Sequence, residues 1–153
     1  MATIRIPPDF SEFLRLLSVH QVRYLLVGGF AVAFHGYPRA TLDMDVWIDR
    51  APENAERIVA AFRQFGFDLP DLSADLFLAE GKMIRMGVPP MRIEVATSIS
   101  GLDFDRCYDA RQEVVLDDVP ICVISLRDLR RNKLAAGRGK DLLDLENLPT
   151  PDP

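Results

Sequence analysis

Two acidic residues alternate with apolar ones in one short segment of the chain. Asp43 and Asp45 flank a single methionine and lead into the apolar run Val46-Trp47-Ile48. Residues two apart in a strand point to the same face, so we expect both carboxylates to project together. Neighbouring carboxylates repel each other unless a cation lies between them, and a divalent metal ion is the natural occupant.

A glycine pair, Gly28-Gly29, follows the apolar run 22–27, which is typical of a buried strand. A glycine turn allows phosphate groups to approach the backbone closely. The glycine turn and the acidic pair together indicate phosphoryl chemistry.

A third carboxylate, Glu94, shows the same alternation in the segment 92–96. Ile93 and Val95 are expected on one face of a strand and Glu94 on the other. If this strand neighbours that of the two aspartates, the three carboxylates lie together and can hold two divalent ions about 3.5–4 Å apart. Mg²⁺ is the expected ion, with Mn²⁺ as the alternative, because it prefers oxygen ligands and shares them with substrate phosphates.

The remaining patterns predict an α/β (α+β) protein with a small mixed sheet and packed helices. A helix is expected to start at Asp9, with an acidic cap and Glu12 at the reciprocal position. The other expected helices cover residues 30–35, 52–65, 72–78 (weakly), 125–136 and 141–148. Strands are expected at residues 22–27, 42–48, 82–86, 91–97, 114–116 and 121–124.

The composition fits one domain, residues 1–148, with a short tail at 149–153. The net charge of −5 argues against non-specific nucleic-acid binding as the main role. Cys107 and Cys122 form no metal or redox motif and imply no disulfide framework, which fits a reducing compartment. The longest near-apolar run, residues 24–34, is shorter than the ~20 residues of a membrane span. We therefore expect a cytoplasmic protein without a membrane partner.

Three sequence blocks resemble the DNA polymerase β-type nucleotidyltransferases. The segments 26–31 and 39–46 match that family's glycine turn and Asp-x-Asp signature, and Glu94 stands at its third acid. The segments 87–94 and 124–144 are similar to a small bacterial subgroup related to the nucleotidyltransferase toxins of the AbiEii and MenT type. The resemblance spans roughly residues 20–148 and implies a minimal nucleotidyltransferase fold, with helices packed mainly on one face of the sheet.

The resemblance also implies roles for the acidic residues and the glycines. Asp43 and Asp45 would hold both metal ions, and Glu94 would hold the catalytic one and help to deprotonate the acceptor hydroxyl. Gly28 and Gly29 would let the backbone approach the triphosphate. The subgroup usually has Asp where this chain has Glu94, whose longer side chain carries the carboxylate farther from the strand.

Further residues of these blocks have both a functional and a plain structural interpretation. Lys133 would contact nucleotide phosphates, or be a solvated helix lysine. Arg138 and Lys140 would bind nucleotide, or close a helix end where cations are favoured. Arg39 and Thr41 would touch nucleotide or only shape their loop.

Four more residues are open in the same way. Asp141 and Asp144 match the subgroup's tail motif, but could cap the last helix or form a salt bridge. His35 is favoured as a packing or capping residue over a catalytic one. Trp47 shares the acidic face and could stack on a base or be covered by the next helix.

The sequence thus predicts an enzyme that transfers a nucleoside monophosphate from an NTP to a hydroxyl of a tRNA, a protein or a small molecule, with release of pyrophosphate. The alternative is a catalytically inert nucleotidyltransferase fold that binds nucleotide or regulates a partner in a toxin–antitoxin pair. A partner toxin or antitoxin is therefore also expected.

Overall fold

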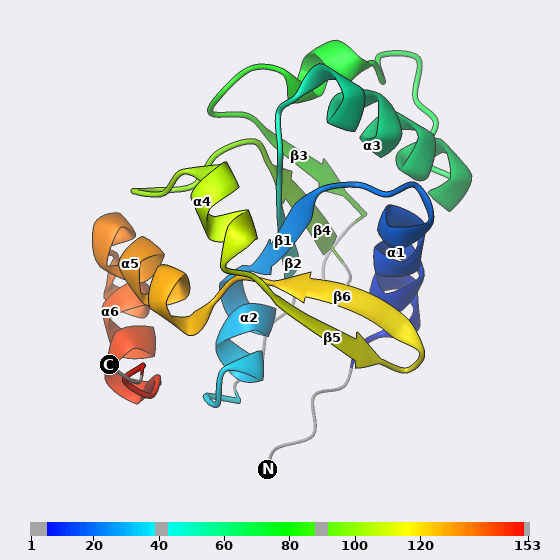
Figure 1. Ribbon diagram of the computed structural model, residues 1–153. Coiled ribbons are helices and arrows are strands. Elements are labelled where there is room, and N and C mark those ends of the chain that lie inside the picture. The colour runs from blue at the N-terminus through cyan, green and yellow to red at the C-terminus, as the bar shows by residue number, and fades with distance from the viewer. Residues whose placement is uncertain (1–5, 39–42, 88–91, 152–153) are drawn as a thin grey trace.

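The computed structural model describes residues 6–38, 43–87 and 92–151. Helices and strands alternate along these residues, and Figure 1 labels most of them. The helices are α1 Pro8–Val19, α2 Gly28–Phe34, α3 Pro52–Phe65, α4 Phe104–Asp109, α5 Leu126–Ala136 and α6 Gly139–Asn147, with a 3-10 turn η1 at Ala74–Phe77. The strands are β1 Tyr24–Val27, β2 Asp43–Ile48, β3 Met83–Met86, β4 Arg92–Ala96, β5 Gln112–Leu116 and β6 Val119–Val123.

The strands form one mixed sheet in the order β3-β4-β2-β1-β6-β5. Strand β2 pairs antiparallel with β1 and parallel with β4. The strand of Asp43 and Asp45 is therefore the direct neighbour of the strand of Glu94. Strands β5 and β6 form the expected hairpin, whose turn residues Asp117 and Asp118 both adopt positive φ. The predicted small mixed sheet with packed helices is confirmed.

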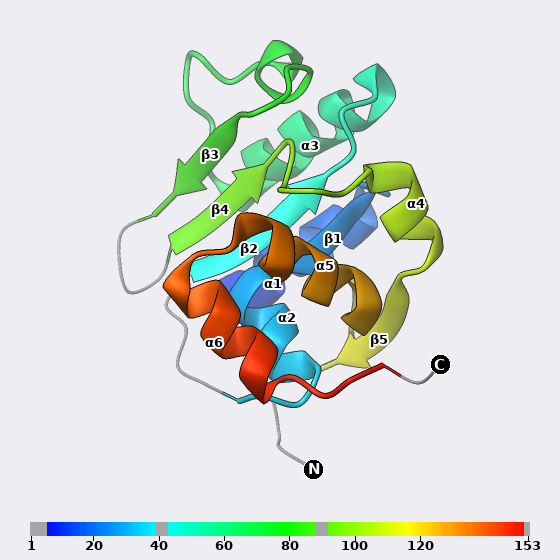
Figure 2. The ribbon, with the colours of Figure 1, turned by 90° about the vertical axis from the view of Figure 1, so that its left-hand side faces the viewer.

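Helices cover both faces of the sheet, so the expectation that they pack mainly on one face is wrong. In Figure 2, α1 and α3 lie behind the sheet, while α4, α5 and α6 lie in front of it. Phe13 of α1 and Phe62 of α3 meet edge to face at 5.7 Å. On the opposite face, Trp47 of β2 meets Phe104 of α4 at 5.1 Å. Strand alternation then directs the fully buried Met44 toward the α1–α3 layer and the two aspartates toward the α4–α6 layer.

Local signals fixed most element ends. Pro52 begins α3 and Gly66, at φ 101°, ends it. The expected acidic cap at Asp9 is wrong: α1 begins at Pro8 after Pro7, with no side-chain cap, because proline is preorganised for the first helical position. Strand β1 is shorter than expected, and η1 is a single 3-10 turn instead of a helix over 72–78.

Helix α4 has no counterpart among the expected elements. Its first turn is capped by Asp103, whose carboxylate accepts a hydrogen bond from the backbone N–H of Arg106. No helix in the described parts of the chain combines the length and apolar character needed to cross a membrane.

Candidate active site

The register between β2 and β4 brings the acidic residues together. Asp45 lies directly opposite Glu94, and Asp43 lies opposite Arg92, on parallel neighbouring strands. Opposite residues of paired strands share a face, so the two aspartates, Glu94 and Arg92 project to the same side. The expected proximity of the three carboxylates is therefore present in the sheet.

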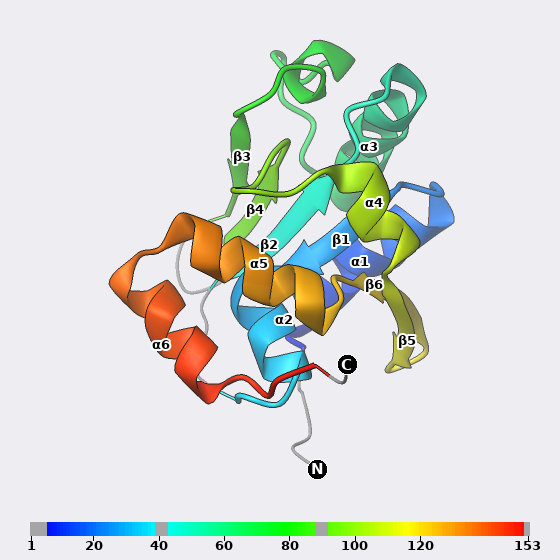
Figure 3. The same cartoon turned by 60° about the vertical axis from the view of Figure 1, so that its left-hand side comes forward.

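These side chains line a cavity of about 630 Å³ in front of the sheet, a size usual for small-molecule sites. Figure 3 shows α5 and α6 beside the ends of β2 and β4. Residues from four strands, the start of α2, the segment after β4, and α5–α6 contribute to the lining: Val27, Gly28, Asp43, Asp45, Met83, Arg85, Arg92, Glu94, Ala96, Ile99, Ser100, Asn132, Ala136, Arg138 and Lys140.

Gly28 lies against the carboxylate of Asp45. It has φ +66°, and a Cβ built on it would come within 2.1 Å of Asp45 Oδ2. Any larger residue would collide with Asp45 and would also be strained at this φ. The glycine turn therefore lets the backbone approach the acidic residues. Gly29 is buried in the first turn of α2 and does not line the cavity.

Asp45 is the most perturbed carboxyl group of this cavity. Burial raises the pKa of Asp45 to about 7, and the charge of Glu94, a hydrogen bond with Glu94 and the charge of Asp43 act in the same direction. The charge of Lys133 opposes this shift. Asp45 is thus a largely buried carboxyl group beside two other carboxyl groups, and a further cation next to it is electrostatically favourable.

Two arginines that the sequence reasoning left out contact the carboxylates. Arg92 donates from one guanidinium nitrogen to Asp43 Oδ2 at 2.8 Å and lies 3.2 Å from Glu94 Oε1. Arg85, opposite Glu94 on β3, lies 3.3 Å from the same Oε1. For Arg92 the sequence contained the signal, because it precedes Glu94 by two residues in the same strand and therefore points to the same face. For Arg85 the shared face follows from its pairing with Glu94 across β3 and β4.

The donor set fits a hard divalent cation, since three carboxylates from adjacent strands face one cavity and Asp45 carries the raised pKa of a carboxylate crowded by others. The side chains are not arranged as a finished cage. Among the residues that the structure describes, no group of three His, Cys, Asp or Glu side chains is positioned to hold a metal ion.

Lys133 was expected either to contact nucleotide phosphates or to be a solvated helix lysine, and the structure places it in neither position. Its side chain is buried, 3.3 Å from Asp141 Oδ1 and 3.0 Å from Asp144 Oδ2, and both aspartates are themselves buried. It is neither a solvated helix lysine nor part of the cavity lining. This cluster fastens α5 to α6 and lies close enough to act on the charge of Asp45.

Arg138 and Lys140 do line the cavity, at the start of α6. Arg138 is the N-cap residue, and Asp141 accepts hydrogen bonds from its backbone N–H at 3.1 Å and its Nε at 2.7 Å. The capping interpretation of Asp141 is thus confirmed, while the exposed guanidinium of Arg138 remains at the cavity. Arg39 and Thr41 lie outside the described residues.

Two further candidates have structural roles. His35 Nε2 lies 2.7 Å from the carbonyl oxygen of Ile124, and burial lowers its pKa, so it packs the end of α2 against the start of α5. Trp47 is 2% exposed beneath Phe104. The covering helix is α4, and the indole is not available to stack on a base.

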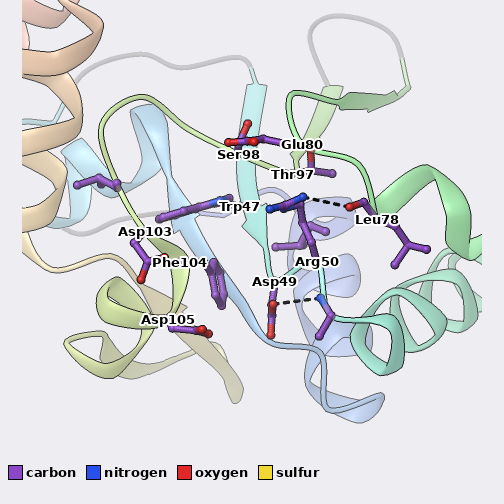
Figure 4. A pocket seen from close by; sticks show the side chains of 13 residues that line it. Trp47, Asp49, Arg50, Leu78, Glu80, Thr97, Ser98, Asp103, Phe104 and Asp105 are labelled. Atoms are coloured by element: carbon purple, nitrogen blue, oxygen red, sulfur yellow. Dashed lines mark hydrogen bonds between the residues drawn. The ribbon is translucent and has the colours of Figure 1, made fainter.

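A second cavity of about 410 Å³ lies at the other end of β2 (Figure 4). Two of its charged side chains are engaged within the protein: Arg50 donates to the carbonyl oxygen of Leu78, and Asp49 accepts from the N–H of Ala51 and pairs with Arg23. The larger cavity, with three carboxylates and four cationic side chains, is therefore the candidate active site.

The chain matched no protein-family model and no curated protein. Among solved structures it is similar to a crystal structure from Thermotoga maritima described as a "putative nucleotidyltransferase", with a TM-score of 0.63 and 16% sequence identity over 93% of each chain. At this identity the similarity shows the fold, and it confirms that the mixed α/β sheet described above has the architecture of that protein.

Proposed function

We propose that this chain is a divalent-metal-dependent nucleotidyltransferase. The observation that carries the proposal is the pairing of Asp45 with Glu94 in a cavity that also holds Asp43 and four cationic side chains. Carboxylates suit the metal ions that accompany nucleotides, and arginine and lysine suit the triphosphate. The fold shared with the Thermotoga maritima protein supports the same reaction class.

In this reaction the acceptor hydroxyl oxygen attacks the α-phosphorus of the NTP. A new oxygen–phosphorus bond forms, the bond from the α-phosphorus to the bridging oxygen breaks, and pyrophosphate leaves with the electron pair. Glu94 accepts the hydroxyl proton. Bound Mg²⁺ or Mn²⁺ would be held by Asp43, Asp45 and Glu94, and would neutralise charge on the phosphates.

The other cavity residues orient the nucleotide. Gly28 leaves the backbone open beside Asp45, so that phosphate oxygens can approach it. Arg138 and Lys140 line the same cavity from the start of α6, where their charges suit contact with the phosphates. This arrangement accelerates the reaction by positioning and charge stabilisation, with no covalent enzyme intermediate.

Calorimetry with each NTP in Mg²⁺ tests nucleotide binding directly. The double variant Asp43→Asn/Asp45→Asn is expected to lose binding at least about 100-fold, because two charged metal ligands are removed. Asp117→Asn/Asp118→Asn is the matched control, because it removes the same charge at the β5–β6 turn, where asparagine tolerates positive φ. Equal NTP binding by wild type and the Asp43/Asp45 variant would refute the proposal.

Label transfer then identifies the acceptor class. Wild-type protein is incubated with labelled NTPs and total tRNA, cell extract or small hydroxyl compounds, and pyrophosphate release is followed in parallel. Transfer that disappears in Asp45→Asn establishes catalysis. If the chain belongs to the subgroup related to the AbiEii and MenT toxins, we expect transfer to tRNA or protein. We also expect an antitoxin partner to inhibit this transfer.

A catalytically inert nucleotide-binding or regulatory protein is the second candidate. Arg92 and Arg85 already neutralise Asp43 and Glu94, and the described carboxylates form no finished metal cage. For such a protein, NTP binding would persist in EDTA and no acceptor would be labelled. Label transfer, together with the calorimetry repeated in EDTA, therefore separates the candidates.

A further inference from the structure

Arg92 lies where it contacts two of the three proposed metal ligands. The same guanidinium nitrogen is 2.8 Å from Asp43 Oδ2 and 3.2 Å from Glu94 Oε1. The register explains this, because Arg92 pairs with Asp43 across the strands and precedes Glu94 by two residues on the same face. A divalent ion shared by Asp43 and Glu94 needs these same oxygen atoms.

The contacts of Arg92 are sheltered, whereas those of Arg85 are exposed. The side chain of Arg92 is 31% exposed and that of Glu94 is 12% exposed, while Arg85 is 58% exposed. Sheltered pairs are screened less by solvent and contribute more than exposed ones. Within the described parts of the chain, Arg92 is thus the more sheltered of the two arginines at these oxygens.

One atom of Arg92 is poorly accommodated in this position. Its Nε is buried and makes no hydrogen bond, which is costly for a charged donor group. A guanidinium that turned away from the carboxylates would still line the cavity, where substrate phosphates could pair with all of its donors.

We propose that Arg92 is an internal cation that competes with the divalent metal for Asp43 and Glu94, and that its displacement delivers the guanidinium to a substrate phosphate. The inference rests on the proposed function, since it concerns regulation of the same site. Metal entry would remove the counter-ion and create a phosphate-binding residue in one step. Binding of metal and of nucleotide would then each strengthen the other, because coupling between two sites is reciprocal.

Mn²⁺ binding, measured by calorimetry and by the loss of the free-ion paramagnetic resonance signal, tests the competition without any turnover. Arg92→Gln is expected to bind Mn²⁺ about tenfold more tightly than wild type. Arg85→Gln is expected to change the affinity less than about threefold, because its pair is exposed. The matched control Arg63→Gln, on α3, is expected to leave it unchanged.

The affinity for nucleotide is expected to change in the opposite direction to the affinity for Mn²⁺. At saturating Mn²⁺, Arg92→Gln is expected to bind NTP about tenfold more weakly, because the displaced guanidinium is missing. Arg92→Lys keeps a positive charge but not the planar fork, so both affinities are expected to lie between those of wild type and Arg92→Gln. A merely structural arginine would not raise metal affinity while lowering nucleotide affinity.

Folding of Arg92→Gln is followed by thermal unfolding in EDTA and in Mn²⁺. Loss of stability in EDTA that Mn²⁺ restores supports the competition, and if the glutamine variant is unfolded in both, Arg92→Lys decides. Mn²⁺ affinity in a folded Arg92 variant that equals or falls below that of wild type overturns the inference. If Arg92→Gln binds Mn²⁺ more tightly but the wild-type protein transfers no label, the competition stands and the nucleotidyltransferase proposal is refuted. If the wild-type protein transfers label but Arg92→Gln binds Mn²⁺ with unchanged affinity, the nucleotidyltransferase proposal stands and the competition is refuted.

Discussion

Asp45 and Glu94 face each other across parallel strands β2 and β4, and the charge of Glu94 adds to the effect of burial on the carboxyl group of Asp45. The raised pKa of Asp45, about 7, expresses this relationship. The pair therefore stores electrostatic repulsion that protonation or a bound cation relieves.

The stability of the protein in EDTA should fall as pH rises toward neutrality. Folding raises the pKa of Asp45 from 3.8 to about 7, so between these values the folded protein holds a proton that the unfolded chain has lost. The free energy of unfolding from this group is then highest below about pH 4 and decreases up to about pH 7. Urea unfolding at several pH values measures the slope.

The variant Asp45→Asn should lose this part of the pH dependence. Because the variant no longer buries a charged group beside Glu94 and Asp43, it is expected to be more stable than wild type at pH 8 in EDTA, by on the order of 1–3 kcal/mol. Asp118→Asn, at an exposed turn, serves as the control and should keep the wild-type slope. Parallel pH profiles for Asp45→Asn and wild type would contradict the raised pKa.

Gly28→Ala is expected to damage both the fold and the site. The added Cβ would meet Asp45 Oδ2 at 2.1 Å, and φ +66° strains any residue with a side chain. We expect a loss of about 1–3 kcal/mol in the free energy of unfolding, together with weaker NTP binding. Denaturant unfolding and calorimetry measure the two effects.

Gly139→Ala is the matched glycine control. Gly139 lies at the start of α6, and a Cβ there would meet nothing within 4 Å. Its stability should stay within about 0.5 kcal/mol of wild type. If both variants behaved alike, the close approach of Gly28 to Asp45 would not be a constraint on the site.

Period-two alternation was sufficient to predict the face shared by Asp43, Asp45 and Glu94. Each acid is flanked by apolar residues that must be buried, and the strand period then fixes where the carboxylate points. The same rule applied to residues 83–86 and 92–96 would have added Arg85 and Arg92. Their meeting with the acids still depended on strand order and register, which no local pattern contains.

Other parts of the site depend on tertiary packing. Lys133 on α5 is buried only because α6 brings two aspartates against it, and an isolated helix pattern cannot show that partner. The sequence allowed Trp47 either to stack on a base or to be buried, and only the position of α4 over the indole distinguishes the two. Helix α4 itself is six residues long, too short to display helical periodicity.

The fluorescence of Trp47 is expected to be that of a buried indole and to stay the same when nucleotide binds. It is the chain's only tryptophan, is 2% exposed and meets Phe104 edge to face. We expect blue-shifted emission and weak acrylamide quenching, both unaffected by NTP. Phe104→Ala should shift the emission to the red, while Phe34→Ala, on α2, should not. Strong quenching by bound NTP would show that a base stacks on the indole.

Lys133→Met should destabilise the protein before it affects nucleotide contacts. The substitution leaves Asp141 and Asp144 buried without this cation, and removing one partner of a buried ion pair costs about 3–5 kcal/mol. Arg63→Ala removes a pair with Asp68 in which both side chains are exposed, and should cost at most about 1 kcal/mol. Urea unfolding compares the two variants.

The triple variant Lys133→Met/Asp141→Asn/Asp144→Asn separates a structural role from phosphate binding. Neutralising the two aspartates removes the buried charge that Lys133 balanced, so part of the lost stability should return, although Asp141 also holds Arg138. NTP affinity is expected to follow stability, because the lysine lies behind the cavity wall and not on it. A Lys133→Met protein as stable as wild type, but unable to bind NTP, would instead place the ammonium group on the triphosphate.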